Sequence, residues 1–174
     1  KKILVIDLDP QGNATTGLGL SNTENSELTI YSVLNGNKKI SEVIQSTKFE
    51  NLNLVTSNVD LSGLEVETAN ENRKAFLLKD KIGDFINSKK NDFSYIFIDC
   101  PPSLNMLTLN AMVAAQSVLV PLQCEFFALE GLSQLLSTIE QVKGSLNPAL
   151  DIQGIVLTMF DARNNLSAQV DADV

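Results

Sequence analysis

Residues 2–13 read KILVIDLDPQGN and are the strongest indication of the fold in the sequence. An apolar run this continuous predicts a strand that is buried on both faces, as the strands of parallel sheets are. Asp7 and Asp9 come at its carboxyl end, which is where ligands bind in an open parallel sheet. Residues 95–102 read YIFIDCPP and repeat the design, with Asp99 at the end. The two strands are therefore expected to bring three carboxylates to one edge of a sheet, as in a site for a metal ion and a phosphate.

The composition limits the chemistry and the compartment. With 174 residues, 44% of them hydrophobic and 20% charged, the chain fits one globular domain. No apolar run reaches the roughly 18 residues of a membrane span and no signal peptide is visible, so we expect a cytoplasmic protein with no membrane partner. The sequence has no histidine, which excludes His-based general base chemistry and His-ligated zinc within these residues. Cys100 and Cys124 are expected to be small buried residues rather than reactive thiolates.

The charge balance is acidic. A net charge of −8 opposes nucleic acid binding by the surface as a whole, although a local basic patch can override an average. The lysine pairs at 38–39 and 89–90 are interpreted as solvated ends of elements rather than as such a patch.

Strands that alternate with helices predict an α/β fold. Apolar, β-branched stretches indicate the strands, and apolar residues at helical spacing indicate the helices. Ser103 is expected to cap a short helix, and Gly144 to end a longer one. The predicted strands are 2–8, 52–57, 95–100, 117–122 and 152–158, and the predicted helices are 71–88, 129–143 and a shorter one after Ser103. Crossover connections between these strands predict a doubly wound, mostly parallel sheet.

Residues 11–51 interrupt this alternation. They begin rich in Gly, Asn, Ser and Thr and then carry short apolar pieces at 30–34 and 40–44. We expect a mobile loop with one or two short helices here, rather than a separate domain.

One glycine pattern imitates a phosphate-binding loop. Gly12 and Gly17 have the spacing of the glycines in G-x-x-x-x-G-K-[ST]. Leu18 and Gly19 stand where that motif needs lysine and a hydroxyl, so the ammonium group and the magnesium-ligating oxygen are both missing. No phosphate cradle is therefore expected among these residues.

Four longer segments carry a more specific signal. They read DLDPQGNAT at 7–15, IDCPPSL at 98–104, VPLQCEFFALEG at 120–131 and LTMFDAR at 157–163. Together, and in this order, they closely resemble the ParA/Soj family of chromosome- and plasmid-partitioning ATPases, relatives of MinD with a deviant Walker A motif. The resemblance covers essentially the whole chain. It implies a P-loop NTPase domain that uses ATP and Mg²⁺.

The resemblance also implies roles for individual residues. Asp9 matches the catalytic aspartate that orients or activates the attacking water. Asp99 matches the aspartate that holds Mg²⁺, usually through water. Asp7 matches a residue close to the Mg²⁺ shell and is expected to serve both metal and nucleotide. The remaining residues expected to bind the nucleotide are Pro10, Gln11, Gly12 and Asn13.

Partners follow from the same resemblance. ATP binding is expected to form a sandwich homodimer that coats DNA nonspecifically, and a centromere-binding ParB-type protein to stimulate hydrolysis and end the dimer. This implies a nucleoid-associated protein of the cytoplasm. Arg163 is expected to touch DNA or the dimer partner, or else to be an exposed arginine without a function. Phe126 and Phe127 are expected in the core or on a partner surface.

The chain also departs from the family. The loop KGGVGK[TS], which lies upstream of the segment matching residues 1–9, is missing, and so is the C-terminal region with much of the basic DNA-binding surface. The chain starts inside a strand without Met and stops at 169–174 inside a predicted helix, so residues 1–174 are expected to be one partial domain. Three aspartates without loop amides and lysines repel a triphosphate. We predict that residues 1–174 alone neither bind nor hydrolyse ATP, which a micromolar affinity would contradict.

Two alternatives remain open at this stage. A receiver-type signalling module also ends strands in acidic residues near Mg²⁺, but Asp9 and Asp99 lie too far apart in sequence, and the last predicted strand has no Lys-Pro ending. A relative that binds ATP without hydrolysing it, and acts as a scaffold, is the second alternative.

Overall fold

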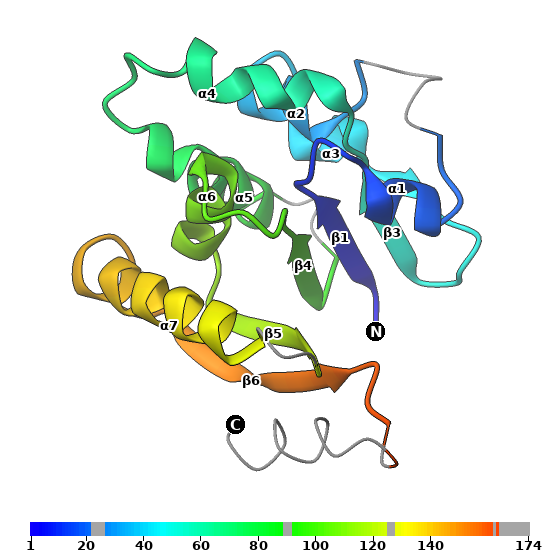
Figure 1. The fold of residues 1–174 in the computed structure, drawn as a ribbon. Helices are drawn as coiled ribbons and strands as arrows, with labels where there is room; N and C mark the ends of the chain where they lie inside the picture. Colours follow the sequence, from blue (N-terminus) through cyan, green and yellow to red (C-terminus); the bar gives the residue numbers. More distant parts are fainter. Residues whose placement is uncertain (22–26, 89–91, 125–127, 162, 164–174) are drawn as a thin grey trace. The chain divides into compact units, whose positions relative to one another are not determined.

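The structure is a computed structural model that describes residues 1–21, 27–88, 92–124, 128–161 and 163 (Figure 1). The chain divides into two compact units, Lys1–Ala114 and Ala115–Val174, which we describe separately. In the described part of the chain, no helix is both long enough and apolar enough to cross a membrane. The expectation of a single partial domain over 1–174 stays a prediction.

The first unit is built on a four-stranded sheet. Its strand order is β2-β3-β1-β4, and β1 runs parallel to both β3 and β4 (Figure 1). The strands are β1 (Ile3–Asp7), β2 (Gln45–Ser46), β3 (Leu52–Val55) and β4 (Tyr95–Asp99). Only β2 is antiparallel, pairing with β3. The three predicted strands of this unit and their parallel arrangement are confirmed.

One face of this sheet carries the core of the unit. Leu4 and Ile6 of β1 are fully buried, and their register partners on β4 are Ile96 and Ile98. Side chains from several helices complete the same apolar cluster. Four of these helices are α2 (Ile30–Leu34), α3 (Ile40–Val43), α5 (Leu77–Ile86) and α6 (Met106–Ala114).

The opposite face is covered unevenly. Because side chains alternate along a strand, Val5 and its register partners Leu54 and Phe97 share this second face. Leu54 on β3 is fully buried, whereas Phe97 on β4 is 51% exposed. Asp7 and Asp99 continue the same row to the carboxyl edge of the sheet.

Residues 11–51 are more regular than the sequence predicts. Three short helices lie here, together with β2, and a 3₁₀ helix and one more short helix follow β3. The elements not yet named are α1 (Asn13–Gly17), η1 (Val59–Gly63) and α4 (Leu64–Glu67). The prediction of one or two short helices was therefore too low, because helices of one turn leave little periodicity in the sequence.

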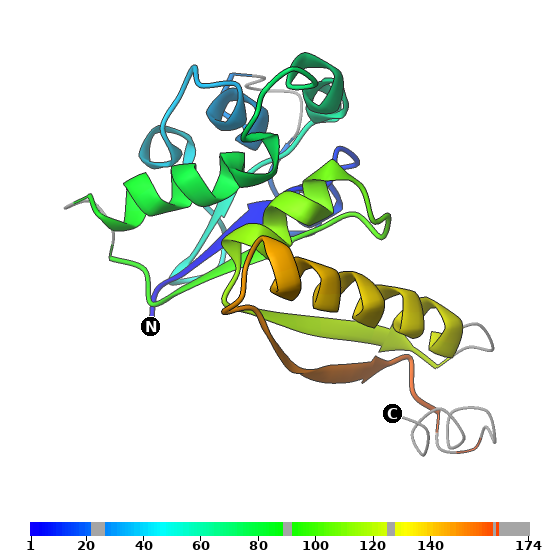
Figure 2. The ribbon, with the colours of Figure 1, turned by 90° about the vertical axis from the view of Figure 1, so that its left-hand side faces the viewer.

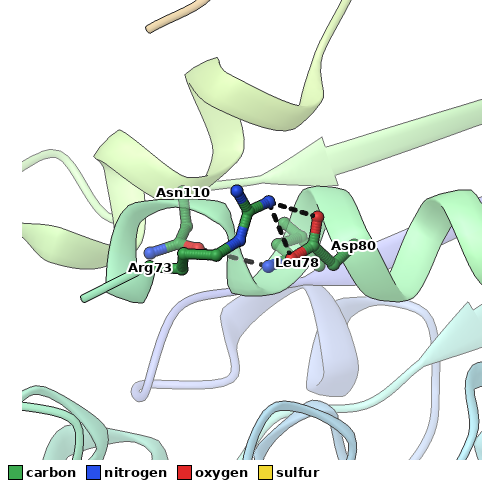
Figure 3. A network of polar contacts seen from close by, with 4 residues as sticks. All are labelled: Arg73, Leu78, Asp80 and Asn110. Atoms are coloured by element: carbon green, nitrogen blue, oxygen red, sulfur yellow. Dashed lines mark hydrogen bonds and ion pairs between the residues drawn. The ribbon is translucent and has the colours of Figure 1, made fainter. Parts of the chain in front are cut away.

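The helix predicted over 71–88 is shorter in the structure. A 3₁₀ turn, η2 (Lys74–Phe76), precedes α5, which begins only at Leu77. Asn110 of α6 accepts a hydrogen bond from the Leu78 backbone N–H at 3.2 Å (Figure 3). It also donates one to the Lys74 carbonyl at 2.8 Å. Arg73 pairs with Asp80 at 3.1 Å across the same turn. A side chain from another helix thus caps α5, which local sequence cannot reveal.

The cap of α6 also differs from the prediction. Asn105, not Ser103, accepts hydrogen bonds from the backbone N–H groups of Leu107 and Thr108, at 3.0 and 3.2 Å. Ser103 instead offers its carbonyl to the Thr108 hydroxyl at 2.6 Å. Both residue types favour N-caps, so the choice between them was decided by where the chain turns.

In its described residues, the second unit is a parallel strand pair with one helix. The elements are β5 (Ser117–Gln123), α7 (Ala128–Ser145) and β6 (Asp151–Thr158), close to their predicted ranges. Leu132 of α7 joins Val120 and Leu122 of β5 in an apolar cluster, and α7 lies along the strand pair in both views (Figures 1 and 2). Gly144 does not end α7, which continues to Ser145, since an interior glycine costs a helix only about 1 kcal/mol. The helix predicted at 169–174 lies outside the described residues.

Candidate functional site

The ends of β1 and β4 bring the predicted acidic residues together. Asp7 and Asp99 are register partners on adjacent parallel strands. The backbone N–H of Leu8 donates to the Asp99 carbonyl at 2.8 Å, so the pairing continues one residue beyond β1. Asp9 follows at once and lies close enough for its charge to act on Asp99. The predicted meeting of the three carboxylates at one edge is confirmed.

Asp7 has a closed environment. Its side chain is fully buried. One carboxylate oxygen accepts a hydrogen bond from the Asp9 backbone N–H at 3.1 Å. The other accepts two from Thr15, from the backbone N–H at 2.7 Å and from the hydroxyl at 2.6 Å. Direct metal coordination by Asp7 would have to displace one of these donors, and its predicted part in the metal and nucleotide site stays a prediction.

Asp9 shapes the turn that follows β1. Its carboxylate Oδ1 accepts from the Gln11 backbone N–H at 2.9 Å, and its carbonyl accepts from Gly12 N–H at 2.9 Å. Gly12 has φ 64° and ψ 34°, a left-handed conformation that glycine adopts without strain. The second oxygen, Asp9 Oδ2, has no partner among the described residues. Asp9 is 8% exposed, so one oxygen of a nearly buried carboxylate remains available for chemistry.

The other residues predicted to bind nucleotide lie in this turn. Pro10 is half-buried, Gln11 is exposed and Gly12 is buried, while Asn13 is exposed at the start of α1. The turn therefore places them beside Asp9 at the carboxyl edge of the sheet. Their contact with a nucleotide stays a prediction.

Asp99 has an open environment. Its side chain is exposed, and its carboxylate accepts no hydrogen bond from the described residues. Partial burial, and then the negative charges of Asp7 and Asp9, raise the pKa of the Asp99 carboxyl above its usual value. A cation at this edge would relieve that repulsion, which makes Asp99 the acid best placed to meet one.

Residues that the sequence did not single out complete the site. The Thr15 hydroxyl, besides donating to Asp7, accepts a hydrogen bond from the Ser57 backbone N–H at 3.1 Å. Ser57 follows β3, so the end of a third strand joins the edge. Ser57 Oγ and Asn58 Oδ1 are buried without a hydrogen-bond partner in the described part of the chain. Buried polar atoms are normally paired, so water or a ligand group would complete them. Thr15 lies in the motif DLDPQGNAT, which was the signal available for it.

Cys100 is not part of the chemistry. Burial, and then the charges of Asp99 and Asp9, raise the pKa of its thiol to about 12. The thiol therefore stays protonated at neutral pH, and Cys124 is buried. Cys124 is buried as predicted, whereas Cys100 is only half-buried, and the lack of reactivity of both stays a prediction.

The acidic edge is suited to a metal ion that is bound only in part by protein side chains, rather than to one enclosed by them. Among the described residues, no group of three or more acidic or cysteine side chains is close enough to hold a metal ion by itself. Mg²⁺ is usually bound by one or two carboxylates together with water and phosphate oxygens. The exposed carboxylate of Asp99 fits that pattern as one such carboxylate.

Comparison with known proteins places the chain in a family. A family profile described as an AAA domain matches residues 1–152. The chain is 51% identical over 174 residues to the chromosome partitioning protein ParA of Caulobacter vibrioides (strain NA1000 / CB15N), covering 100% of this chain and 64% of that protein. It is 43% identical over 174 residues to the sporulation initiation inhibitor protein Soj of Bacillus subtilis (strain 168), covering 100% of this chain and 67% of that one. The chain belongs to the ParA/Soj family.

Solved structures agree with ParA/Soj membership. The cobyrinic acid a,c-diamide synthase from Mycobacterium smegmatis, with bound ADP and magnesium, matches with a TM-score of 0.90 at 37% identity. The match covers 99% of this chain and 68% of that chain. The predicted doubly wound, mostly parallel P-loop NTPase fold is thereby confirmed.

This ParA/Soj-family chain covers part of the length of its relatives. It spans 64% of the length of the Caulobacter relative. Its 174 residues contain no G-x-x-x-x-G-K-[ST] motif. What the described residues do supply is the acidic edge formed by Asp7, Asp9 and Asp99.

Two further predictions for the ParA/Soj chain concern its partner surfaces. Arg163 pairs with Asp161 at 2.8 Å, and its side chain is 90% exposed. The guanidinium lowers the pKa of the Asp161 carboxyl. Contact of Arg163 with DNA or a dimer partner stays a prediction. Phe126 and Phe127 lie outside the described residues.

Proposed function

We propose that this chain forms the acidic part of the Mg²⁺-ATP site of a DNA-partitioning ATPase. In this proposal Asp9 orients the attacking water through its unpartnered oxygen, Oδ2. Asp99 holds Mg²⁺ through water, and Asp7 keeps the turn that carries Asp9 in place. Gln11, Gly12 and Asn13 lie beside the nucleotide.

The observation that carries the proposal is that the three carboxylates at one edge differ in how free they are to bind a ligand. Asp7 accepts three hydrogen bonds, Asp9 has one free oxygen, and Asp99 is open. Phosphoryl transfer needs a group that orients the nucleophile and a group that holds the metal, which fits the two available acids. ParA and Soj are the names of the relatives, and the synthase from M. smegmatis binds ADP and magnesium, which supports both cofactors.

The residues of the chain contribute to the reaction by position and charge. Mg²⁺, when bound, would neutralise charge that develops on the phosphate oxygens. Asp9 accepts a hydrogen bond from the attacking water and aligns it. The Asp9 backbone N–H and one carboxylate oxygen, Oδ1, form hydrogen bonds in the turn. These bonds hold the other oxygen, Oδ2, which faces the water, in a fixed direction. The negative charge that raises the pKa of Asp99 favours a cation at the same place.

The proposal requires a phosphate-binding loop in addition to these residues. Three carboxylates alone oppose a triphosphate by Coulomb repulsion. The full-length protein, by which we mean this chain joined to the lysine-bearing loop of the family, is expected to bind ATP. Residues 1–174 by themselves are expected neither to bind nor to hydrolyse it.

The biological role extends this proposal. ATP binding forms a homodimer, the dimer binds DNA nonspecifically, and a ParB-type centromere-binding protein stimulates hydrolysis. Because the chain has a net charge of −8, the DNA-binding surface lies mostly in other parts of the full-length protein. The proposed location is the cytoplasm, on the nucleoid. Identity to the relative named ParA is 51%, against 37% to the synthase, which favours partitioning over synthase chemistry.

Substitution of Asp9 in the full-length protein tests the proposal. Asp9→Ala is expected to dimerise with ATP but to lose turnover, since the water loses its orienting group. ATP hydrolysis is measured by phosphate release, and dimerisation by light scattering. Asp84→Ala is the matched control, because Asp84 is an exposed aspartate on α5, and it should hydrolyse ATP normally.

The same experiment separates the alternatives. Turnover at the unsubstituted rate in Asp9→Ala would contradict the role of Asp9. If the unsubstituted protein dimerised with ATP but never hydrolysed it, the non-hydrolysing scaffold would be correct. A receiver-type module is not supported, because the chain belongs to the ParA/Soj family.

A further inference from the structure

We propose that Thr15 is a positioning residue for ATP hydrolysis, which sets the orientation of Asp9 by acting through Asp7. The inference rests on the proposed function of Asp9. It concerns a hydroxyl group that touches neither substrate nor metal in the proposal and that joins three segments of the chain.

The contacts of Thr15 are short and fully enclosed. Thr15 and Asp7 are each 0% exposed. The hydroxyl lies 2.6 Å from Asp7 Oδ2, and the backbone nitrogen lies 2.7 Å from the same oxygen. The Ser57 backbone nitrogen lies 3.1 Å from the hydroxyl oxygen. One side chain of α1 therefore connects the end of β1 with the segment that follows β3.

The direction of these hydrogen bonds is determined by the partners. A backbone N–H can only donate, so the Thr15 oxygen accepts from Ser57. An ionised carboxylate can only accept, so the Thr15 hydroxyl donates to Asp7. The hydroxyl therefore accepts from the segment that follows β3 and donates to the end of β1. A side chain of the same shape without a hydroxyl would fill the space and lose both bonds.

The connection continues from Asp7 to Asp9. The second oxygen of Asp7 accepts the Asp9 backbone N–H at 3.1 Å. Asp9 in turn holds the N–H groups of Gln11 and Gly12. If Asp7 rotates or shifts, its hydrogen bond to the Asp9 backbone N–H is lost. The start of the turn is then no longer held, and Asp9 Oδ2 no longer points in a fixed direction. Water cannot replace the lost donor easily, because the Thr15–Asp7 contact is buried.

The neighbouring threonine offers a matched control. Thr16 is exposed on the same short helix, and its hydroxyl donates to the Gly12 carbonyl at 2.8 Å. That bond stays within one helical turn and is only partly buried. Thr15→Val and Thr16→Val therefore remove the same group from adjacent positions. Only the first removes the hydroxyl bonds to Asp7 and Ser57, and it leaves the bond from the Thr15 backbone N–H to Asp7 in place.

The test uses the full-length protein and steady-state ATP hydrolysis. Thr15→Val is expected to lower kcat by about 10-fold to 100-fold with KM for ATP nearly unchanged, since small misplacements of a reacting group cost rates of this size. Thr15→Ser, which keeps the hydroxyl, is expected to recover most of kcat. Thr16→Val is expected to stay within about twofold of the unsubstituted protein, because Thr16 is an exposed residue whose hydroxyl contacts neither Asp7 nor Ser57.

A double-substitution cycle shows whether Thr15 acts through Asp7. In Asp7→Ala, no side-chain oxygen is left to accept from the hydroxyl, so adding Thr15→Val should lower kcat much less than it does alone. Thermal unfolding and binding of a non-hydrolysable ATP analogue are measured for each variant. If Thr15→Val does not fold, Thr15→Cys, which has a similar size and a weaker donor, replaces it and should show the same loss of kcat.

The outcomes separate this inference from the proposed function. Normal kcat in Thr15→Val, together with loss of turnover in Asp9→Ala, would overturn the inference and keep the function. A loss in Thr15→Val that Thr15→Ser does not restore, or losses that simply add in the double variant, would also overturn it. Normal turnover in Asp9→Ala would overturn the function itself.

Discussion

Asp7 and Asp99 end neighbouring parallel strands, face each other in register, and have opposite environments. Asp7 is fully buried and accepts three hydrogen bonds. Asp99 is exposed, and its carboxylate accepts none from the described residues. The difference follows from the sheet, since β1 has strand partners on both sides and α1 follows it, whereas β4 has one strand partner in the described sheet. An aspartate at a strand end is therefore held in place when neighbouring groups donate hydrogen bonds to it. It stays free to bind a ligand when they do not.

The row of apolar residues below these acids shows the same gradient. Leu54 on β3 is fully buried, and Phe97 on β4 is 51% exposed, although Val5 pairs with both. The second face of the sheet is thus covered at β3 and open at β4. The open side lies beside Asp99, where the proposal places the metal and the nucleotide.

Substitution of the buried Asp7 should have the largest effect on stability. Asp7→Ala leaves the donors of Asp9 and Thr15 buried without an acceptor, so we expect a loss of about 3 kcal/mol or more in the free energy of unfolding. Urea unfolding followed by circular dichroism measures this loss. Asp99→Ala is the control, and it should cause little or no loss. Equal losses in the two variants would show that the contrast between the two acids is wrong.

The second largest effect should be the difference in stability between substitutions at the two ends of the apolar row, Leu54 and Phe97. Leu54→Ala creates a cavity in a buried site and should cost roughly 2 kcal/mol or more. Phe97→Ala removes a larger side chain but from a half-exposed site, so in the 174-residue chain it should cost less. Unfolding midpoints of the two variants give the comparison. A greater loss for Phe97→Ala would mean that the face at β4 is covered in that chain.

The smallest effect concerns pH. The pKa of Asp99 is raised above its usual value of 3.8, so the folded state prefers the protonated carboxyl. Its contribution to stability is therefore present below that value and is lost as the pH rises through the folded-state pKa. Asp99→Asn removes the charge and should raise the unfolding midpoint at neutral pH without metal or nucleotide, with the gain fading as the pH falls below about 4. A variant that is less stable than the unsubstituted chain at neutral pH would contradict this.

The strands and the acidic edge could be predicted because their signals are local. A buried parallel strand is apolar along its whole length, and the carboxyl ends of such strands meet at one edge. Asp7, Asp9 and Asp99 could be assigned to that edge without any contact being known. The difference between them could not, because it depends on partners that the pattern of a strand does not show.

The remaining features depend on contacts between distant residues. Ser57 and Thr15 are 42 positions apart, and Asn110 and Leu78 are 32 apart, yet each pair is joined by one hydrogen bond. Nothing in the residue types near 71–88 shows that Asn110 caps α5. Short helices such as α1 and α3 make too few turns to leave an apolar period, so residues 11–51 were predicted as mostly loop.

A structure of the full-length protein with Mg²⁺ and a non-hydrolysable ATP analogue would show how the three acids meet the nucleotide. We expect the metal to meet Asp99 through a water molecule, Asp9 Oδ2 to face the terminal phosphate, and the Thr15 hydroxyl still to donate to Asp7. A metal bound directly by Asp7, with Thr15 displaced, or a nucleotide away from the ends of β1 and β4, would contradict this expectation.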